Sequence, residues 1–137
     1  ASAFGMAGEE IVRDLLHMWN YSMCVPLDPS SPFDLVVKDG EDWITIQIKH
    51  SKLSSIPLTR EAKLNGVRIK RKYKKGDFDY LFVCQFPYIY IIPWGEMKNH
   101  TRFNFKKHEE YRHDLTNIST YTNRVNLEKE ENERTIN

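Results

Sequence analysis

A carboxylate, an amide and an ammonium group come together on one face of the β-hairpin that the sequence predicts. Gln47 and Lys49 are two residues apart in one strand, so their side chains lie on the same face. Asp34 lies on the other arm and reaches that face if its apolar neighbours pack with the isoleucines of the return strand. Glu9, on a helix near the N-terminus, is able to approach the same place.

These residue types favour a metal-assisted phosphodiesterase site. Two acids and an amide oxygen suit a hard divalent cation such as Mg²⁺, which prefers oxygen ligands. The lysine beside them can orient an attacking water or neutralise the charge that develops on a phosphate. The alternative is an ordinary half-exposed strand, in which the isoleucines face the core while Gln47 and Lys49 face solvent.

The first acid is positioned by a helix expected over about Gly8–Asn20. At about 100° per residue its apolar side chains fill one arc, with Met18 at one end. Glu9 falls about 20° beyond this arc, at the rim of the buried face, whereas Glu10 lies in the middle of the polar face. The two adjacent glutamates are therefore expected to have different environments.

Alternating apolar residues predict the hairpin that carries the other site residues. Its first strand is expected over Phe33–Lys38, with Phe33, Leu35 and Val37 on the core face. Asp39-Gly40 is a strong turn signal and leads into the return strand, Trp43–His50.

Weaker patterns indicate the remaining elements of the chain. A short strand is expected around Ser22–Pro26, and a second hairpin over Tyr80–Gln85 and Tyr88–Ile92, joined near Pro87. Residues 96–115 are expected to be partly helical, and residues 120–137 to form a loosely ordered tail.

A strongly basic segment separates the two predicted hairpins. It has eight basic residues and one acid, Glu61, although the net charge of the whole chain is only +1. Such local charge favours contact with a polyanion, and a solvated surface is the alternative. The basic residues are Arg60, Lys63, Arg68, Lys70, Arg71, Lys72, Lys74 and Lys75.

The composition is that of one globular domain. The 137 residues are 40% hydrophobic, 12% aromatic and 28% charged, which excludes a wholly disordered chain. The longest apolar run, Tyr88–Trp94, is far shorter than the roughly 20 residues of a membrane span, and the N-terminus lacks a secretory signal pattern. Cys24 and Cys84 have apolar neighbours and no CxxC spacing, which favours buried thiols in a soluble intracellular protein.

Three stretches of the sequence resemble the PD-(D/E)XK nuclease core in its QxK form. They are Gly8-Glu9 at the start of a helix, Pro32-Phe33-Asp34-Leu35-Val36-Val37, and Ile46-Gln47-Ile48-Lys49. The likeness is nearest to small group I intron-encoded homing endonucleases of this fold, whose sheet is completed by strands similar to Phe78–Val83 and Tyr88–Pro93. Archaeal-type Holliday junction resolvases come next. The resemblance covers about residues 8–95 and implies an α/β, restriction-endonuclease-like fold with an αβββαβ core and a mixed central sheet.

The resemblance also implies a reaction and roles for the site residues. The expected reaction is Mg²⁺-dependent hydrolysis of double-stranded DNA that leaves 5′-phosphate ends, with Mn²⁺ able to substitute. By position, Asp34 is the metal-binding acid, Gln47 occupies the place of the usual second acid, and the Ile48 carbonyl completes the metal ligands. Lys49 is the catalytic lysine that positions the attacking water, and Glu9 acts directly or through water.

Two features depart from the family pattern. Gln47 in place of a carboxylate removes one negative charge, which leaves the number of metal ions open. The basic segment stands where a connecting helix is expected, but Gly66 and the crowded charges interrupt its helical period. It is alternatively a DNA-contacting loop or hairpin.

We therefore expect a site-specific DNA endonuclease of the homing or restriction type. The alternatives are a Holliday junction resolvase and a noncatalytic DNA-binding module on the same fold. We expect a single nuclease domain over residues 1–137, with residues 96–137 forming a peripheral helix and tail. Because coordinated cutting of two strands requires two active sites, a homodimer or homotetramer is expected. The expected location is the cytoplasm or the nucleoid, without membrane contact.

Overall fold

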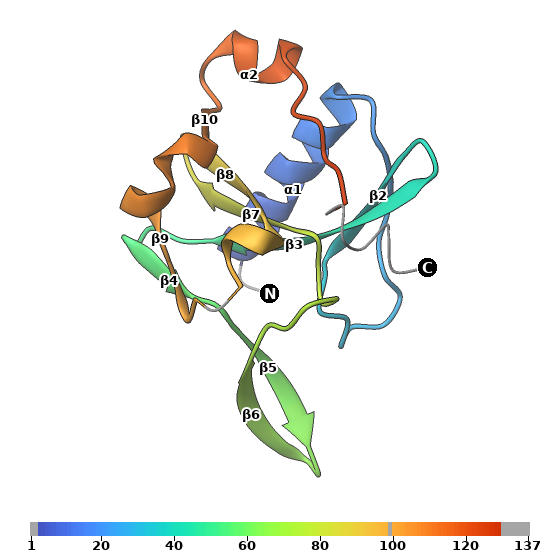
Figure 1. Ribbon diagram of the computed structural model, residues 1–137, viewed down its shortest axis with the longest axis vertical. Coiled ribbons are helices and arrows are strands. Elements are labelled where there is room, and N and C mark those ends of the chain that lie inside the picture. The colour runs from blue at the N-terminus through green and yellow to red at the C-terminus, as the bar shows by residue number, and fades with distance from the viewer. Residues whose placement is uncertain (1–2, 99, 130–137) are drawn as a thin grey trace.

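A mixed β-sheet forms the centre of the molecule (Figure 1). The computed structural model describes residues 3–98 and 100–129. The helices are α1 (Ala3–Met18) and α2 (Ile118–Thr122), and the 3-10 helices are η1 (Trp94–Glu96) and η2 (Phe105–Tyr111). The strands are β1 (Ser22–Cys24), β2 (Leu35–Asp39), β3 (Asp42–His50), β4 (Ser55–Pro57), β5 (Thr59–Leu64), β6 (Val67–Lys72), β7 (Tyr80–Gln85), β8 (Tyr88–Pro93), β9 (Arg102–Asn104) and β10 (Arg112–Asp114).

Six of these strands form the central sheet in the order β1-β2-β3-β7-β8-β10. Strands β3 and β7 are parallel, and the other neighbours in this sheet are antiparallel. Two small antiparallel sheets, β4 with β9 and β5 with β6, lie outside it. The mixed central sheet that the sequence predicts is confirmed.

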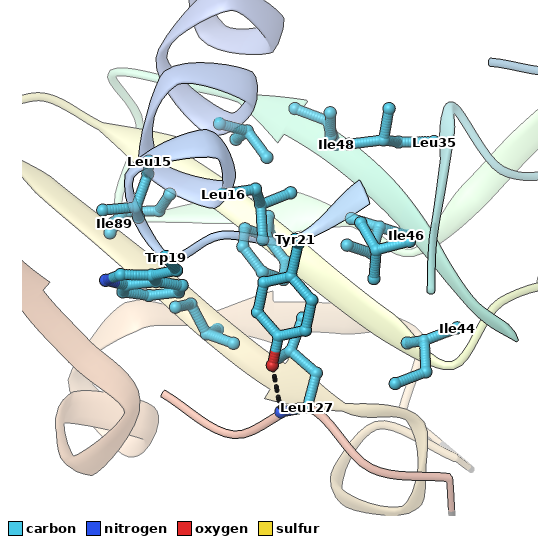
Figure 2. Close-up of a cluster of buried hydrophobic side chains, with 14 of the residues drawn as sticks. Leu15, Leu16, Trp19, Tyr21, Leu35, Ile44, Ile46, Ile48, Ile89 and Leu127 are labelled. Atoms are coloured by element: carbon cyan, nitrogen blue, oxygen red, sulfur yellow. Dashed lines mark hydrogen bonds between the residues drawn. The ribbon is translucent and has the colours of Figure 1, made fainter. Parts of the chain in front are cut away.

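Helix α1 covers one face of the central sheet and builds the first core cluster (Figure 2). Its apolar residues repeat every three to four positions, so that Leu15, Leu16 and Trp19 face the sheet and are buried, with Leu15 and Trp19 beside Ile89 of β8. The chain after α2 closes this cluster, where the backbone N–H of Leu127 donates to the hydroxyl of Tyr21. The buried members are Val12, Leu15, Leu16, Trp19, Tyr21, Leu35, Val37, Ile44, Ile46, Ile48, Phe82, Cys84, Ile89, Ile91, Leu115 and Leu127.

The opposite face of the sheet carries the second core cluster. Side chains alternate along β7, so Phe82 belongs to the first cluster while Leu81 and Val83 belong to the second. By the same alternation in β3, Gln47 and Lys49 lie on the side of the second cluster. The buried members are Ile56, Leu58, Phe78, Leu81, Val83, Tyr90, Ile92, Trp94, Met97, Phe103 and Phe105.

The crossover from β3 to β7 contains a β-hairpin in place of the helix expected there. Strands β5 and β6 pair from Thr59 opposite Lys72 to Leu64 opposite Val67. The turn between them is Asn65-Gly66, with both residues at positive φ, the combination that two-residue hairpin turns favour. Figure 1 shows this hairpin extending away from the central sheet. The basic segment therefore has the hairpin conformation, and the helix of the expected αβββαβ order is absent from residues 51–79.

Three local predictions are wrong. Met18 is 58% exposed because it lies at the edge of the apolar arc and at the last residue of α1. Phe33 packs against the second cluster instead of joining Leu35 and Val37, since the regular alternation of β2 begins only at Leu35. Cys24 is exposed because β1 is an edge strand, whereas Cys84 is buried, and both thiols are free.

The segment after η1 contributes more to the fold than a peripheral helix and tail. Its partly helical character is confirmed by η2, but β10 extends the central sheet by pairing with β8. Leu127 is fully buried in the first core cluster. The remainder of the predicted tail, residues 130–137, lies outside the described residues. None of the helices in the described residues has the length and apolarity that a membrane crossing requires.

Candidate active site

The candidate site lies where β2 separates from β3. Strand β2 begins at Leu35, opposite Ile46, whereas β3 continues to His50. Asp34 stands at the point of separation. Its N–H donates to the Ile46 carbonyl at 2.8 Å, and its Oδ2 accepts a hydrogen bond from the Ile48 N–H at 2.9 Å. The carboxylate thus accepts a hydrogen bond from a backbone N–H of β3 that has no partner in β2. This hydrogen bond holds Asp34 against β3.

Gln47 and the Ile48 carbonyl face the same opening. Gln47 is only 9% exposed, and its Nε2 donates to the Ile48 carbonyl oxygen at 3.2 Å. The N–H and C=O of a strand residue point to the same edge, so this carbonyl lies on the side where Asp34 binds the Ile48 N–H. Three oxygen-bearing groups therefore gather at the end of β2.

Lys49 lies beside this group against an aromatic ring. Its Nζ is 5.4 Å from the centroid of Tyr73. Burial lowers the pKa of Lys49, and the Asp34 carboxylate acts in the opposite direction. Burial also raises the pKa of Tyr73 to about 12, so its phenol stays neutral at physiological pH. The ammonium group is consequently held in a poorly hydrated position, next to a neutral ring and near a carboxylate.

The electrostatic environment of Asp34 connects the sheet to α1. Burial raises the pKa of Asp34, and the hydrogen bond from Ile48 opposes that increase. The charge of Glu9 raises this pKa further, whereas the charges of Lys49 and Arg13 lower it. The charges of two side chains on α1 and one on β3 therefore all act on the Asp34 carboxylate.

Glu9 reaches this gap because α1 approaches the end of β3 closely. A Cβ atom on the neighbouring Gly8 would lie 3.2 Å from the His50 Cβ, so a larger residue would crowd the contact. Glu9 is half-buried and binds Arg13 at 3.1 Å, with its side chain 34% exposed, whereas Glu10 is exposed. The predicted difference in exposure between the two adjacent glutamates is confirmed.

Asp34 and Gln47 line a cleft of about 700 Å³. Asp34, Gln47 and Lys49 line one wall, and hairpin β5–β6 together with residues 29–32 lines the others. Arg60, at the base of the hairpin, donates from Nη2 to the Ser30 carbonyl at 2.6 Å and connects these walls. The cleft thus has a carboxylate and an amide on one wall, and three basic side chains with Glu61 on the hairpin wall.

The eight basic residues do not form one surface. Arg60, Lys63 and Arg68 line the cleft with the candidate site residues. The other five are divided. Lys72, Lys74 and Lys75 line a separate pocket, and Lys70 and Arg71 line neither of the two.

Two residues near the site were not predicted to belong to it. Arg13 lies four residues after Glu9, and this spacing is the sequence signal for the ion pair that the structure contains. Tyr73 packs edge-on against Phe78 with ring centroids 5.0 Å apart. Its position beside Lys49 depends on the path of the crossover, for which the sequence has no local signal.

The donor set fits a hard cation. The Asp34 carboxylate, the Gln47 amide and the Ile48 carbonyl offer oxygen, which Mg²⁺ prefers, and no thiol or imidazole of the kind that zinc sites use. Among the described residues, no three His, Cys, Asp or Glu side chains gather as a metal site. The lack of such a group agrees with the presence of the Gln47 amide at a position where a carboxylate would otherwise be a third acidic ligand.

Comparisons with known proteins agree with this geometry. A family model described as PD-(D/E)XK endonuclease matches residues 5–127. The fold is similar to that of a bacterial homing endonuclease, I-Ssp6803I, with a TM-score of 0.60 and 17% identity over 76% of this chain and 78% of that chain. It is also similar to a Holliday junction resolvase from the archaeal hyperthermophile Archaeoglobus fulgidus, with a TM-score of 0.50 and 10% identity over 81% and 98% of the two chains. None of the curated proteins matches the sequence. The resemblance drawn from the sequence motifs is confirmed.

Proposed function

Because the chain belongs to the PD-(D/E)XK endonuclease family, we propose that it is a Mg²⁺-dependent, site-specific endonuclease of double-stranded DNA, of the homing or restriction type. The observation that carries this proposal is the cleft in which Asp34, Gln47 and Lys49 face Lys63 and Arg68 of the hairpin. Basic side chains of this kind bind DNA phosphates. A carboxylate beside the phosphate does not help a domain that only binds DNA to hold the strand, because like charges repel.

Asp34, the Gln47 amide and the Ile48 carbonyl are the groups that would hold Mg²⁺. When bound, Mg²⁺ supplies Lewis-acid polarisation of the phosphate and acidifies a coordinated water. The backbone N–H of Ile48 fixes one oxygen of Asp34, so the carboxylate is oriented before any ligand arrives. Such preorganisation avoids the cost of ordering the carboxylate during the reaction.

Lys49 is the residue that we assign to the reacting phosphate. In the proposed reaction a water oxygen attacks phosphorus, the bond from phosphorus to the 3′ oxygen breaks, and a proton passes to that oxygen, leaving a 5′-phosphate. Lys49 positions the water and stabilises the negative charge that builds up on the phosphate oxygens. Because burial removes water from around its ammonium group, this interaction is stronger than at an exposed lysine. Glu9 orders water at the outer edge of the site.

We also propose that the protein acts as a homodimer or homotetramer in the cytoplasm or on the nucleoid. In the described residues of one chain, Asp34, Gln47 and Lys49 line a single cleft, and two strands must be cut to break a duplex. A symmetric assembly places two such clefts on one target.

The proposed activity is tested by cleavage of a randomised duplex library together with genomic DNA, in Mg²⁺ and in EDTA. We expect cut ends that carry 5′-phosphates, require Mg²⁺ and share a preferred sequence when they are sequenced. A synthetic four-way junction is included in parallel, because a resolvase would cut the junction symmetrically and leave linear duplex intact.

A third outcome would support the noncatalytic alternative. If the protein binds duplex DNA in a salt-sensitive manner but cuts neither the library nor the junction, with either Mg²⁺ or Mn²⁺, the nuclease proposal is wrong. The noncatalytic DNA-binding module would then be the better description of this fold.

A further inference from the structure

A second pocket lies on the other side of Tyr73 from the proposed active site. Its volume is about 340 Å³, and Tyr73 lines both this pocket and the cleft. Four lysines surround it. They are Lys72, Lys74, Lys75 and Lys98. None of the described residues that line this pocket is acidic, so an anion entering it meets only positive and neutral groups.

The inner wall of this pocket is apolar and already formed. Phe78 and Trp94 are 2% and 8% exposed, and their rings meet edge to face with centroids 5.3 Å apart. Tyr73 packs edge-on against the same Phe78. Because these rings belong to the second core cluster, the wall need not reorganise to receive a ligand.

The combination of the two walls selects the chemistry of the ligand. Lysine ammonium groups attract an anion such as a phosphate. A wall of aromatic rings offers few polar partners, so it accepts a flat or apolar group and not a strongly hydrated one. Inorganic phosphate would use only the lysines, and an uncharged ring would use only the aromatic wall. A nucleotide carries both a phosphate and a ring, and a pocket of this volume admits it.

We propose that this pocket binds one nucleotide unit of the DNA strand, next to the phosphate that lies in the cleft. The lysines bind its phosphate, and its sugar and base lie against the wall of Phe78 and Trp94. The continuity through Tyr73 places the pocket one aromatic ring from Lys49, so a strand that leaves the cleft on this side reaches the pocket next. The assignment of DNA as the polymer rests on the proposed function, whereas the nucleotide chemistry rests on the pocket itself.

The indole N–H resonances of the three tryptophans provide the test. Uniformly ¹⁵N-labelled protein is titrated without divalent metal with deoxyadenosine monophosphate, with deoxyadenosine and with inorganic phosphate. We expect the monophosphate to shift the Trp94 signal, while Trp19, buried in the first core cluster, serves as an internal reference. The nucleoside and the phosphate should each bind at least about fivefold more weakly.

A pair of charge-matched variants tests the lysine rim. We expect Lys74→Ala/Lys98→Ala to weaken nucleotide binding about tenfold, since it removes two cationic partners of the phosphate. The control Lys38→Ala/Lys107→Ala removes the same charge outside the pocket and should bind within about twofold of the wild type. The four lysines substituted in these two variants are all exposed, so both variants should fold.

Four results would overturn the inference. A Trp94 signal that does not move, or equal weakening in both variants, would show that the pocket binds no nucleotide. Phosphate as effective as the monophosphate would show a simple anion site. If a short DNA strand fails to displace the monophosphate, the ligand is a free nucleotide and the proposed strand path is wrong. A protein that binds the monophosphate at Trp94 but never cleaves DNA would contradict the proposed function alone.

Discussion

At the scale of single residues, Asp34 has both a structural and a proposed chemical role. Its carboxylate accepts the Ile48 N–H that the end of β2 leaves without a strand partner. One oxygen is thereby engaged, and the residue also lines the cleft. Replacing Asp34 by alanine should therefore disturb the end of β3 as well as the proposed chemistry, which makes Lys49 the better residue for a functional test.

The two adjacent glutamates of α1 provide a paired test of the helix face. We expect Glu9→Ala to lower the rate of Mg²⁺-dependent cleavage at saturating DNA by about tenfold, because Glu9 acts on Asp34 across the gap. Glu10→Ala, at an exposed position, should stay within about twofold of the wild type. Single-turnover rates of the two variants measure the difference.

The ion pair of Glu9 with Arg13 requires its own control. Arg13→Ala removes the same ion pair while keeping the carboxylate of Glu9. If Arg13→Ala lowers the cleavage rate as much as Glu9→Ala does, the effect comes from the lost ion pair. If Glu10→Ala lowers the rate as much as Glu9→Ala does, our assignment of the helix face is wrong.

The residues on regular elements were predictable, and those that depend on the path of the chain were not. Alternation along β3 was enough to place Gln47 and Lys49 together. Phe33 was misplaced because the alternation was extended through Asp34, where the N–H already donates to Ile46 and the regular strand has not begun. Tyr73 reaches Lys49 only through a long crossover, and no local pattern encodes that contact.

At the scale of elements, the hairpin β5–β6 is expected to bind the phosphate backbone. Lys63 and Arg68 are directly opposite each other and both line the cleft. We expect Lys63→Ala/Arg68→Ala to lower the slope of log affinity against log salt by about two, since about one counterion is released for each phosphate contact. Lys38→Ala/Lys107→Ala, with the same loss of charge elsewhere, should leave the slope unchanged.

The measurement is DNA affinity at several salt concentrations in EDTA. The cleavage rate at saturating DNA should change by no more than about threefold, because these residues bind DNA and do not touch the reacting group. An unchanged salt slope in the hairpin variant would mean that DNA does not pass along this wall of the cleft.

We expect the stability of the protein to depend on pH through His113 of β10. Burial lowers the pKa of His113 below its ordinary value of 6.5, so at mildly acidic pH the unfolded chain binds more protons than the folded one. The contribution of His113 to the free energy of unfolding is therefore fully present above about pH 6.5. It is lost as the pH falls toward the pKa of His113 in the folded protein. Relative to the wild type, His113→Gln should gain stability on acidification, which urea unfolding at about pH 7.5 and 5.5 will measure.

His17 is the control for this prediction, because it lies exposed in α1. His17→Gln should follow the wild type at both pH values. A His113→Gln variant whose unfolding free energy keeps a constant difference from the wild type would contradict the account of β10.

Most elements, though not their connections, follow from the sequence. Helix α1, the hairpin of β2 with β3 and that of β7 with β8 have strong periodicity and turn signals. The β5–β6 hairpin was only one of two alternatives because its charged residues hide the alternation, and Asn65-Gly66 is its clearest signal. Strand β10 is three residues long and is stabilised by pairing with β8, which a local pattern does not reveal.

At the scale of the whole molecule, the account predicts an assembly. One chain has a mass of 16.3 kDa, and we expect two or four times this value by analytical ultracentrifugation at micromolar concentration. The physical reason is that two clefts are required to cut both strands of one target in a coordinated manner. A mass of one chain, both with and without a duplex target, would contradict the proposed oligomer.

The central claim is that the cleft formed by Asp34, Gln47 and Lys49 is a nuclease active site, and Lys49→Ala tests it most directly. Cleavage of the preferred duplex is followed under single-turnover conditions in Mg²⁺, and DNA affinity is measured in EDTA, with Lys38→Ala as the control. We predict a loss of cleavage of at least about a hundredfold in Lys49→Ala, with DNA affinity within about threefold of the wild type. Cleavage at the wild-type rate by Lys49→Ala would contradict the account.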